Sequence, residues 1–361
     1  MRERATLTGG AGGRYHRPAA QKRFAPQIRG NQEEINVPRL SQHLRALASA
    51  VLIAAWLLSP AHAAWPERPV TIIVPWGAGG AADQLARILA SLLEQDLKQP
   101  FNVVQRTGGS GVVGHQAMVN AKPDGYTLGL ATVEITMFQH QGLASFNHRD
   151  FTIVAIINTD AGGLMVRSDS PYKNAKQLID DIKTKPAQTL KASGTGQGGI
   201  WHLGLVGWLL DEGVDPAKVP WVPSQGSAPA MQDLVAGGVN FVTASLPEGR
   251  TFIEAGKVRP LANMDKTRLT QYDAPTLKEA TGSNWTVLTW RGIVGPKGIP
   301  KDVLDVLAPA LKKAHSSKQY RDFVNERGFG WAWMEPEESV KFMDSSYQDF
   351  GRVMKASGMI K

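Results

Sequence analysis

The stretch of this chain with the clearest chemical meaning is a glycine-rich turn that runs from Trp76 to Ala81 and contains Gly77, Gly79 and Gly80. Glycine lets backbone N–H groups approach a ligand closely, because it has no side chain to hold the ligand away. The turn precedes a helical pattern, and the dipole at a helix N-terminus favours negative charge. This combination predicts a site for an anion. The same glycines would also serve an ordinary strand-to-helix turn that needs positive φ, and the residues leave that alternative open.

A strand before this turn and a helix after it must hold those N–H groups in place. Residues 70–74 form a β-branched run bounded by prolines, which is typical of a buried strand. The predicted helix carries one apolar stripe at helical spacing, formed by Leu85, Ile88, Leu89, Leu92, Leu93 and Leu97.

Three more glycine-rich turns follow predicted strands, at residues 106–111, 194–199 and 224–229. Strands alternate with helices along the chain, which favours an α/β architecture with largely parallel sheets. In open α/β sheets, ligands lie beyond the carboxyl ends of the strands, where such turns gather. Two sheets that face each other would bring four helix N-termini around one cleft, as in a periplasmic binding protein. A chain of 361 residues can build two domains of this kind.

The positive charge of the chain is concentrated at its N-terminus. Residues 1–63 hold nine of the 40 basic residues and three of the 32 acidic ones, so the remainder is almost neutral. No basic tract is left that would favour a nucleic acid as a partner. The sequence has no cysteine, and the five histidines after residue 63 show no metal-ligand spacing. We therefore expect neither a metal nor a cofactor.

The N-terminal segment has the features of a processing signal. Arg39 and Arg45 precede an apolar run at residues 46–58 that is too short to span a bilayer comfortably. The small-x-small sequence at residues 61–63 fits a cleavage site, so we predict export by a signal peptide cleaved after Ala63. Residues 1–36 are too long for a normal n-region, which favours a translation start further down the chain. A retained membrane anchor is the alternative.

The order of these motifs resembles that of the Bug proteins, the extracytoplasmic solute receptors of tripartite tricarboxylate transporters. The resemblance extends from about Trp65 to the C-terminus, and it depends on the ordered set rather than on any single motif. The matching segments are residues 74–83, 105–111, 122–128, 193–203, 226–230 and 274–280.

This resemblance implies an α/β flytrap whose two domains close on a small organic carboxylate, with mostly parallel sheets flanked by helices. Domain I would comprise residues 64–164 and 288–361, and domain II residues 165–287. The resemblance also implies that no reaction is catalysed, that the protein is periplasmic and monomeric, and that it delivers its ligand to a large and a small membrane subunit. A bulky Trp201 just before His202 could alter the cleft, so the bound acid cannot be transferred from the family.

The resemblance also implies which residues face the ligand, namely residues of the first, third and last glycine-rich turns and the segment at residues 132–133 after a predicted strand. Asp83 has a second interpretation as a helix cap or a brace of the turn, which we prefer. We expect His202 to be structural, and the pair Trp331 and Trp333 to lie on a strand and to pack. Glu248 follows a strand end and could meet an amino or hydroxyl group of the ligand. The implied ligand-binding residues are Trp76, Ala78, Gly79, Gly80, Ala81, Asp83, Thr132, Val133, Thr195, Gly199, Ile200, Gly226, Ser227 and Ala228.

Two other functions are compatible with parts of the sequence. Residues 77–82 fit the dinucleotide fingerprint G-x-G-x-x-A, and Arg106 could bind the 2′-phosphate of the cofactor in an NADP-linked oxidoreductase. Against this function, Pro75 ends the strand and no acidic residue occupies the ribose position. A receptor that reports ligand occupancy to a membrane sensor would share the same cleft chemistry, and the sequence does not separate it from a transport receptor.

Overall fold

The computed structural model describes residue 47 and residues 65–360, and the latter lie in one compact unit. The predicted signal peptide and cleavage site therefore lie outside the described residues. Within the described part of the chain, no helix has both the length and the apolar character needed to cross a membrane.

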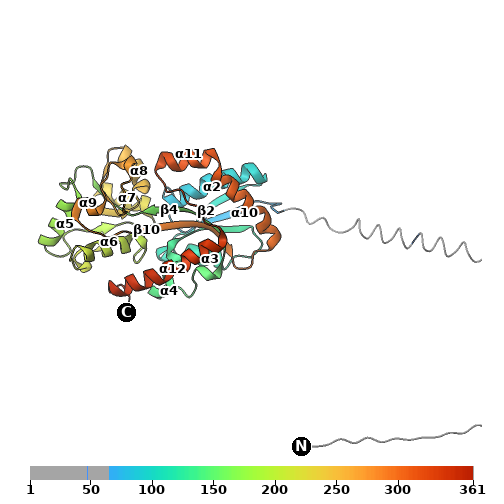
Figure 1. The fold of residues 1–361 in the computed structure, drawn as a ribbon, viewed down its shortest axis with the longest axis horizontal. Coiled ribbons are helices and arrows are strands. Elements are labelled where there is room, and N and C mark those ends of the chain that lie inside the picture. Colours follow the sequence, from blue (N-terminus) through green and yellow to red (C-terminus); the bar gives the residue numbers. More distant parts are fainter. Residues whose placement is uncertain (1–46, 48–64, 361) are drawn as a thin grey trace, which may run out of the picture. The chain divides into compact units, whose positions relative to one another are not determined.

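Two five-stranded sheets form the centre of the fold (Figure 1). The first sheet has the order β2-β1-β3-β10-β4 and the second the order β7-β6-β8-β5-β9. The strands of the first sheet are β1 (Val70–Val74), β2 (Phe101–Gln105), β3 (Thr127–Thr132), β4 (Phe151–Ala161) and β10 (Leu288–Pro296). Those of the second are β5 (Gly163–Arg167), β6 (Ala192–Ser193), β7 (Trp221–Val222), β8 (Phe241–Ala244) and β9 (Val258–Asn263).

Each sheet is half parallel and half antiparallel, so the expectation of mostly parallel sheets is wrong in this detail. Strand β1 pairs in parallel with β2 and β3, whereas β10 runs antiparallel to both β3 and β4. In the second sheet β6 is parallel to its neighbours, and β5 is antiparallel to β8 and β9. The reason is that only Gly162 separates β4 from β5, and β10 returns from the second sheet to the first. Strands that arrive from the other sheet need no crossover helix and can run antiparallel.

Helices cover both faces of each sheet (Figure 1). On the first sheet, α2, α10 and α11 lie on one face, and α3 and α12 on the other. The eleven α-helices in the described residues are α2 (Ala81–Leu97), α3 (Val112–Val119), α4 (Phe138–Gln141), α5 (Ala175–Thr184), α6 (Ile200–Asp211), α7 (Ser227–Ala236), α8 (Leu246–Glu254), α9 (Leu277–Thr281), α10 (Lys301–Ser316), α11 (Lys318–Arg327) and α12 (Pro336–Ala356). Short 3-10 turns lie at Gly109–Gly111, Val133–Thr136, His148–Asp150, Pro216–Lys218 and Thr270–Tyr272.

The packing of two helices explains why their N-termini are held rigidly. Helix α2 buries the predicted stripe, including Leu85, Leu89 and Leu93, against the first sheet. Helix α6 is apolar on nearly all sides and is buried almost completely, as expected for a helix inside a core. The larger apolar cluster contains residues of both sheets, so the two sheets share packed side chains.

The expected strand around Trp331 and Trp333 is wrong. Both tryptophans lie in an irregular segment after α11, and the Trp331 ring, 51% exposed, stacks on His315 with the ring centroids 5.4 Å apart. Alternation of two tryptophans over three residues resembles a strand, but here the rings cover a helix instead.

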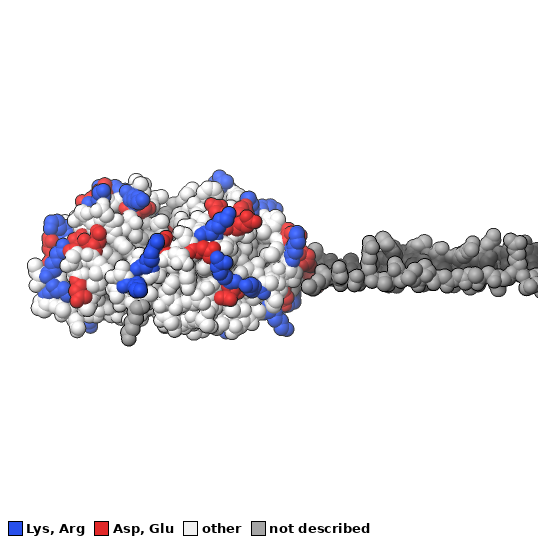
Figure 2. All heavy atoms as spheres, turned by 60° about the horizontal axis from the view of Figure 1, so that its bottom comes forward, with Lys and Arg blue, Asp and Glu red and all other residues white. Residues whose placement is uncertain are grey.

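On the face shown in Figure 2, basic and acidic side chains are interspersed without a continuous basic patch.

Candidate ligand-binding site

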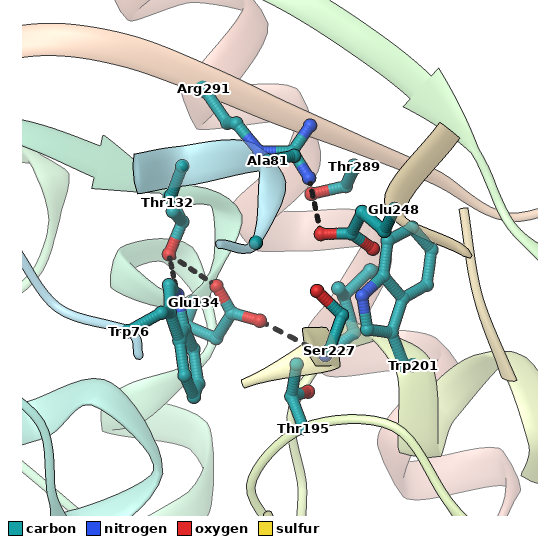
Figure 3. Close-up of a pocket in the computed structure, with 13 residues that line it drawn as sticks. Trp76, Ala81, Thr132, Glu134, Thr195, Trp201, Ser227, Glu248, Thr289 and Arg291 are labelled. Carbon is teal, nitrogen blue, oxygen red and sulfur yellow. Dashed lines mark hydrogen bonds and ion pairs between the residues drawn. The ribbon is translucent and has the colours of Figure 1, made fainter. Parts of the chain in front are cut away.

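The N-termini of α2, α6 and α7 meet around one cavity. Their N-cap residues are Gly80, Gly199 and Gly226, and none of the three helices has a side-chain cap among the described residues. A glycine N-cap leaves the first N–H groups of its helix for other partners. The cavity is lined by Trp76, Gly80, Ala81, Ala82, Thr132, Glu134, Thr195, Ile200, Trp201, Ser227, Glu248, Thr289 and Arg291 (Figure 3).

The cavity is small. Its volume is about 20 Å³, which is room for roughly one water molecule. Because it is lined by residues of both sheets, a larger ligand can enter only if the lining residues of the two sheets move apart. The geometry is that of a closed cleft.

Half of the residues expected to face a ligand line this cavity. They are Trp76, Gly80, Ala81, Thr132, Thr195, Ile200 and Ser227. The others lie beside it in the same turns or the same segment: Ala78, Gly79, Asp83, Val133, Gly199, Gly226 and Ala228. The structure also brings in six residues that the expected set does not contain: Ala82, Glu134, Trp201, Glu248, Thr289 and Arg291.

Asp83 braces the first turn instead of lining the cavity. Its carboxylate accepts a hydrogen bond of 2.9 Å from the backbone N–H of Gly79, and it is also bonded by Arg87 and by the side-chain amide of Gln105. Gly79 is the residue with positive φ, at +84°, whereas the N-cap Gly80 has an ordinary φ of −74°. The brace that we preferred for Asp83 therefore agrees with its contacts.

The first and fourth glycine-rich turns touch each other. The N–H of Gly77 donates to the carbonyl oxygen of Gln225 over 2.7 Å. A Cβ placed on Gly80 would lie 3.1 Å from the hydroxyl of Ser227. The N-terminus of α2, from the first sheet, thus faces the N-terminus of α7, from the second sheet.

A directed chain of hydrogen bonds connects the first turn to α6 (Figure 3). The indole N–H of Trp76 donates to Thr132 Oγ1 over 3.1 Å, and this hydroxyl donates to Glu134 Oε2 over 2.5 Å. The other oxygen of Glu134 accepts the N–H of Ile200 over 3.2 Å. Glu134 lies on the 3-10 turn after β3, beside the first sheet. It thus accepts a hydrogen bond from the first N–H of α6, a helix beside the second sheet. Its signal in the sequence is an acidic residue two positions after the strand end, where Val133 was expected to face the cleft.

His115 fixes the backbone beneath this chain. Its Nε2 accepts the N–H of Thr132 over 3.1 Å, so Nδ1 carries the proton and donates to the carbonyl of Gly111 over 2.8 Å. Burial lowers the pKa of His115 to about 4, which keeps the ring neutral in this role. His202 is also structural, as expected, because its Nδ1 accepts the N–H of Gly198.

We expect the stability of the protein to fall as the pH drops from about 6.5 to 4, in part because of His115. Its pKa is lowered from 6.5 to about 4 in the folded state, so the unfolded chain binds a proton first and folding loses free energy across this window. The full contribution is on the order of 3 kcal/mol, since each pKa unit corresponds to about 1.4 kcal/mol. Urea unfolding at several pH values would measure it.

The control for this prediction is His115→Gln, which can still accept and donate but does not titrate. Between pH 6.5 and 4, unfolding of this variant should take up about one proton fewer than unfolding of the unchanged protein, so its stability should depend less on pH. Buried Glu134 and Glu248 act in the opposite direction, because burial raises the pKa of each carboxyl. An identical pH dependence in both proteins would contradict a neutral His115.

One wall of the cavity is a buried charge cluster around Arg291. This side chain is 3% exposed and donates to Asp160 over 2.5 Å, to Asn158 over 2.6 Å and to Glu248 over 3.0 Å. Arg291 and Asp160 come from the antiparallel pair β10 and β4, and Glu248 comes from α8 beside the second sheet. Glu248 also completes a capping box with Ser245, since its Oε2 accepts the N–H of that residue. The cluster therefore links the two sheets at the cavity.

The described residues hold no group of three His, Cys, Asp or Glu side chains that could bind a metal ion. The groups that face the cavity are helix N–H groups, hydroxyls, two carboxylates, one guanidinium and two tryptophans. These groups can bind a small polar solute by hydrogen bonds and charge.

Comparison with known proteins shows the family to which this chain belongs. Residues 85–359 match the family model described as "Tripartite tricarboxylate transporter family receptor". The chain is 31% identical over 278 residues to the UPF0065 protein in the tcbD-tcbE intergenic region of Pseudomonas sp. strain P51, covering 76% of this chain and 82% of that protein. It also resembles the solved structure of the periplasmic binding protein BugD, with a TM-score of 0.77, 26% identity, and coverage of 82% of this chain and 100% of that one.

A second similar structure is that of R. palustris Rpa4515 with adipate, which has a TM-score of 0.77, 27% identity, and coverage of 81% of this chain and 98% of that one. The chain therefore has the fold of two-domain periplasmic binding proteins, and its family is one of solute-binding receptors, not of enzymes. The chain belongs to the Bug family of tripartite tricarboxylate transporter receptors, as the motifs predicted.

Proposed function

We propose that this protein captures a small organic carboxylate in the cavity and delivers it to the large and small membrane subunits of a tripartite tricarboxylate-type transporter. The observation that carries the proposal is the meeting of the α2 and α7 N-termini, where Gly80, Ala81 and Ser227 line the cavity. Two helix dipoles directed at one point favour an anion there. The family of the chain, and the adipate in the similar Rpa4515 structure, support a carboxylate as that anion.

We also propose that the two sheets mark two domains, with the boundaries given by residues 64–164 plus 288–361 and residues 165–287. In support, every strand of the first sheet falls in the former ranges, and all strands of the second fall in the latter except for the start of β5 at Gly163. The two segments that cross between the sheets, at Gly162 and before β10, are the candidate hinges.

A thermal-shift screen tests the proposed ligand class. The protein is expressed as the full chain, purified from the periplasm, and tested with di- and tricarboxylates, acidic amino acids and aromatic acids. A ligand at 100 times its Kd should stabilise the protein by about 2.7 kcal/mol, because it binds only the folded state. Stabilisation by uncharged solutes but by no acid would contradict the proposal.

Closure of the cleft makes a separate prediction. Since the cavity holds about 20 Å³, the ligand-free protein must open to admit an organic acid, and ligand should then close it. Small-angle scattering should show a smaller radius of gyration with saturating ligand than without it. An unchanged radius would indicate that the ligand enters without movement of the domains.

A further inference from the structure

The proposed carboxylate site does not account for the acidic side chains in the same cavity. Glu134 is 3% exposed and Glu248 is 7% exposed, and both line the cavity that we assign to an anionic ligand (Figure 3). Two buried carboxylates beside a bound carboxylate would repel it, unless something positive or hydrogen-bond-donating lies between them.

The hydrogen bonds show which partners these carboxyl groups already have. Both oxygens of Glu134 act as acceptors, one from the hydroxyl of Thr132 and one from the N–H of Ile200. Both oxygens of Glu248 also act as acceptors, one from Arg291 and one from the N–H of Ser245. A carboxylate oxygen has two lone pairs, so each group can accept a further hydrogen bond from the cavity.

Arg291 does not neutralise the site. It is paired with two acidic side chains at once, Asp160 and Glu248, so one guanidinium is shared between two carboxyl groups. Within the described residues, the groups that donate to Glu134 are neutral, so none of them is a cation that would compensate its carboxylate. The guanidinium is therefore an unsuitable anchor for a second carboxylate of a ligand. The side chains that line the cavity therefore include two acidic groups and only one basic group, in addition to the helix dipoles.

One more polar atom in the cavity lacks a partner. Thr195 Oγ1 is buried and makes no hydrogen bond to any described residue, although Thr195 is only 5% exposed. A buried hydroxyl without a partner costs about 1–3 kcal/mol, so a ligand group that bonds it would gain from its presence. Thr195 Oγ1 and Glu134 Oε1 both lie near the N-terminus of α6, because a Cβ placed on Gly199 would be 3.1 Å from the former and 3.4 Å from the latter.

We propose that the preferred ligand is a zwitterion of the amino acid type, whose carboxylate binds the α2 and α7 N-termini and whose ammonium group is received by Glu134 and Glu248. The inference rests on the proposed function, because it takes the anion site as given. An ammonium group has three N–H donors and no acceptor, so it can donate to the oxygens of Glu134 and Glu248 that can accept a further hydrogen bond. An acid without the amino group leaves Glu134 without a cation in the closed cleft, and it leaves Glu248 with a guanidinium that is shared with Asp160.

Calorimetry with matched pairs of acids tests this inference. The pairs differ only by the amino group: aspartate and succinate, glutamate and glutarate, alanine and propionate, phenylalanine and 3-phenylpropionate. In the pair that fits the cavity, we expect the amino acid to bind at least about 10-fold more tightly than its partner. Equal or tighter binding of the amine-free acid would overturn the inference while leaving the proposed carboxylate function intact. If no pair binds while another carboxylic acid binds in the thermal-shift screen, the inference fails and the proposed function stands; if no acid binds in either experiment, both fail.

Two variants separate recognition of the ammonium group from a structural role. Glu134→Gln and Glu248→Gln keep one acceptor oxygen each, and each should reduce the preference for the amino acid by about 10-fold or more. The amine-free acid should bind the variants as well as it binds the unchanged protein, or better. A general structural defect would instead weaken both acids equally, and that result would count against the inference. Glu279→Gln, at an exposed salt bridge outside the cavity, is the matched control and should change neither affinity.

Discussion

Replacing Gly80 with valine is expected to reduce the affinity for the carboxylate ligand by a factor of about 100 or more. A Cβ at this position would lie 3.1 Å from Ser227 Oγ, and the two methyl groups of valine would enter the cavity where the α2 and α7 N-termini face each other. Two lost hydrogen bonds to a charged group cost about 1.5–3 kcal/mol each, which corresponds to that factor. Isothermal titration calorimetry with the ligand found in the screen measures it.

The matched control is Arg106→Ala. Arg106 is exposed on the loop after β2 and does not line the cavity, so its replacement should change the affinity less than about threefold. Gly80 is buried rather than at an open surface, and circular dichroism must show that the valine variant remains folded. Its neighbour in the clash is the end of a serine side chain that can rotate, which favours folding. Loss of binding in Arg106→Ala with normal binding in Gly80→Val would contradict an anion site built on backbone amides.

The elements of the fold could be predicted well because their signals are local. Strand β1 (Val70–Val74) has the predicted bounds, and the predicted apolar stripe lies within α2 (Ala81–Leu97). Helix α8 begins at Leu246, where Ser245 and Glu248 form a capping box, and this too is a local signal.

The direction of the strands could not be predicted in the same way. Parallel pairing was inferred from alternation of strands and helices, which is valid for β1, β2 and β3. The antiparallel neighbours of β10 are set by how the chain crosses between the two sheets, and this is a property of distant segments. Alternation alone cannot indicate which strands arrive from the other sheet.

The residues of the candidate site also differ in whether local sequence signals could predict them. Residues at the turns, such as Gly80, Thr195 and Ser227, could be placed in the cavity because glycine-rich turns mark helix N-termini. Arg291 could not, because nothing near residue 291 shows that β10 runs beside β4 and brings the guanidinium to Asp160 and Glu248. A buried ion pair depends on contacts of high sequence separation, here 131 residues to Asp160.

We expect Arg291→Met to cost about 3–5 kcal/mol of stability, the largest loss that a single substitution in the cavity wall should cause. Methionine fills much of the volume but leaves Asp160 and Glu248 buried without their cation, and removing one partner of a buried pair has this magnitude. Burial already raises the pKa of Glu248 although Arg291 opposes this, so the loss should be greatest at neutral pH. It should shrink as the pH falls through that raised pKa and Glu248 takes up a proton.

Chemical unfolding of three variants, each compared with the unchanged protein, tests this prediction. In the triple variant Arg291→Met, Asp160→Asn and Glu248→Gln, the buried charges are removed together, so most of the lost stability should return. Lys301→Met breaks a salt bridge whose side chains are 85% and 59% exposed, and it should cost less than about 1 kcal/mol. If the triple variant is as unstable as Arg291→Met alone, the guanidinium contributes by packing between β10 and β4. In that case the cluster does not supply the charges on which recognition of an ammonium group depends.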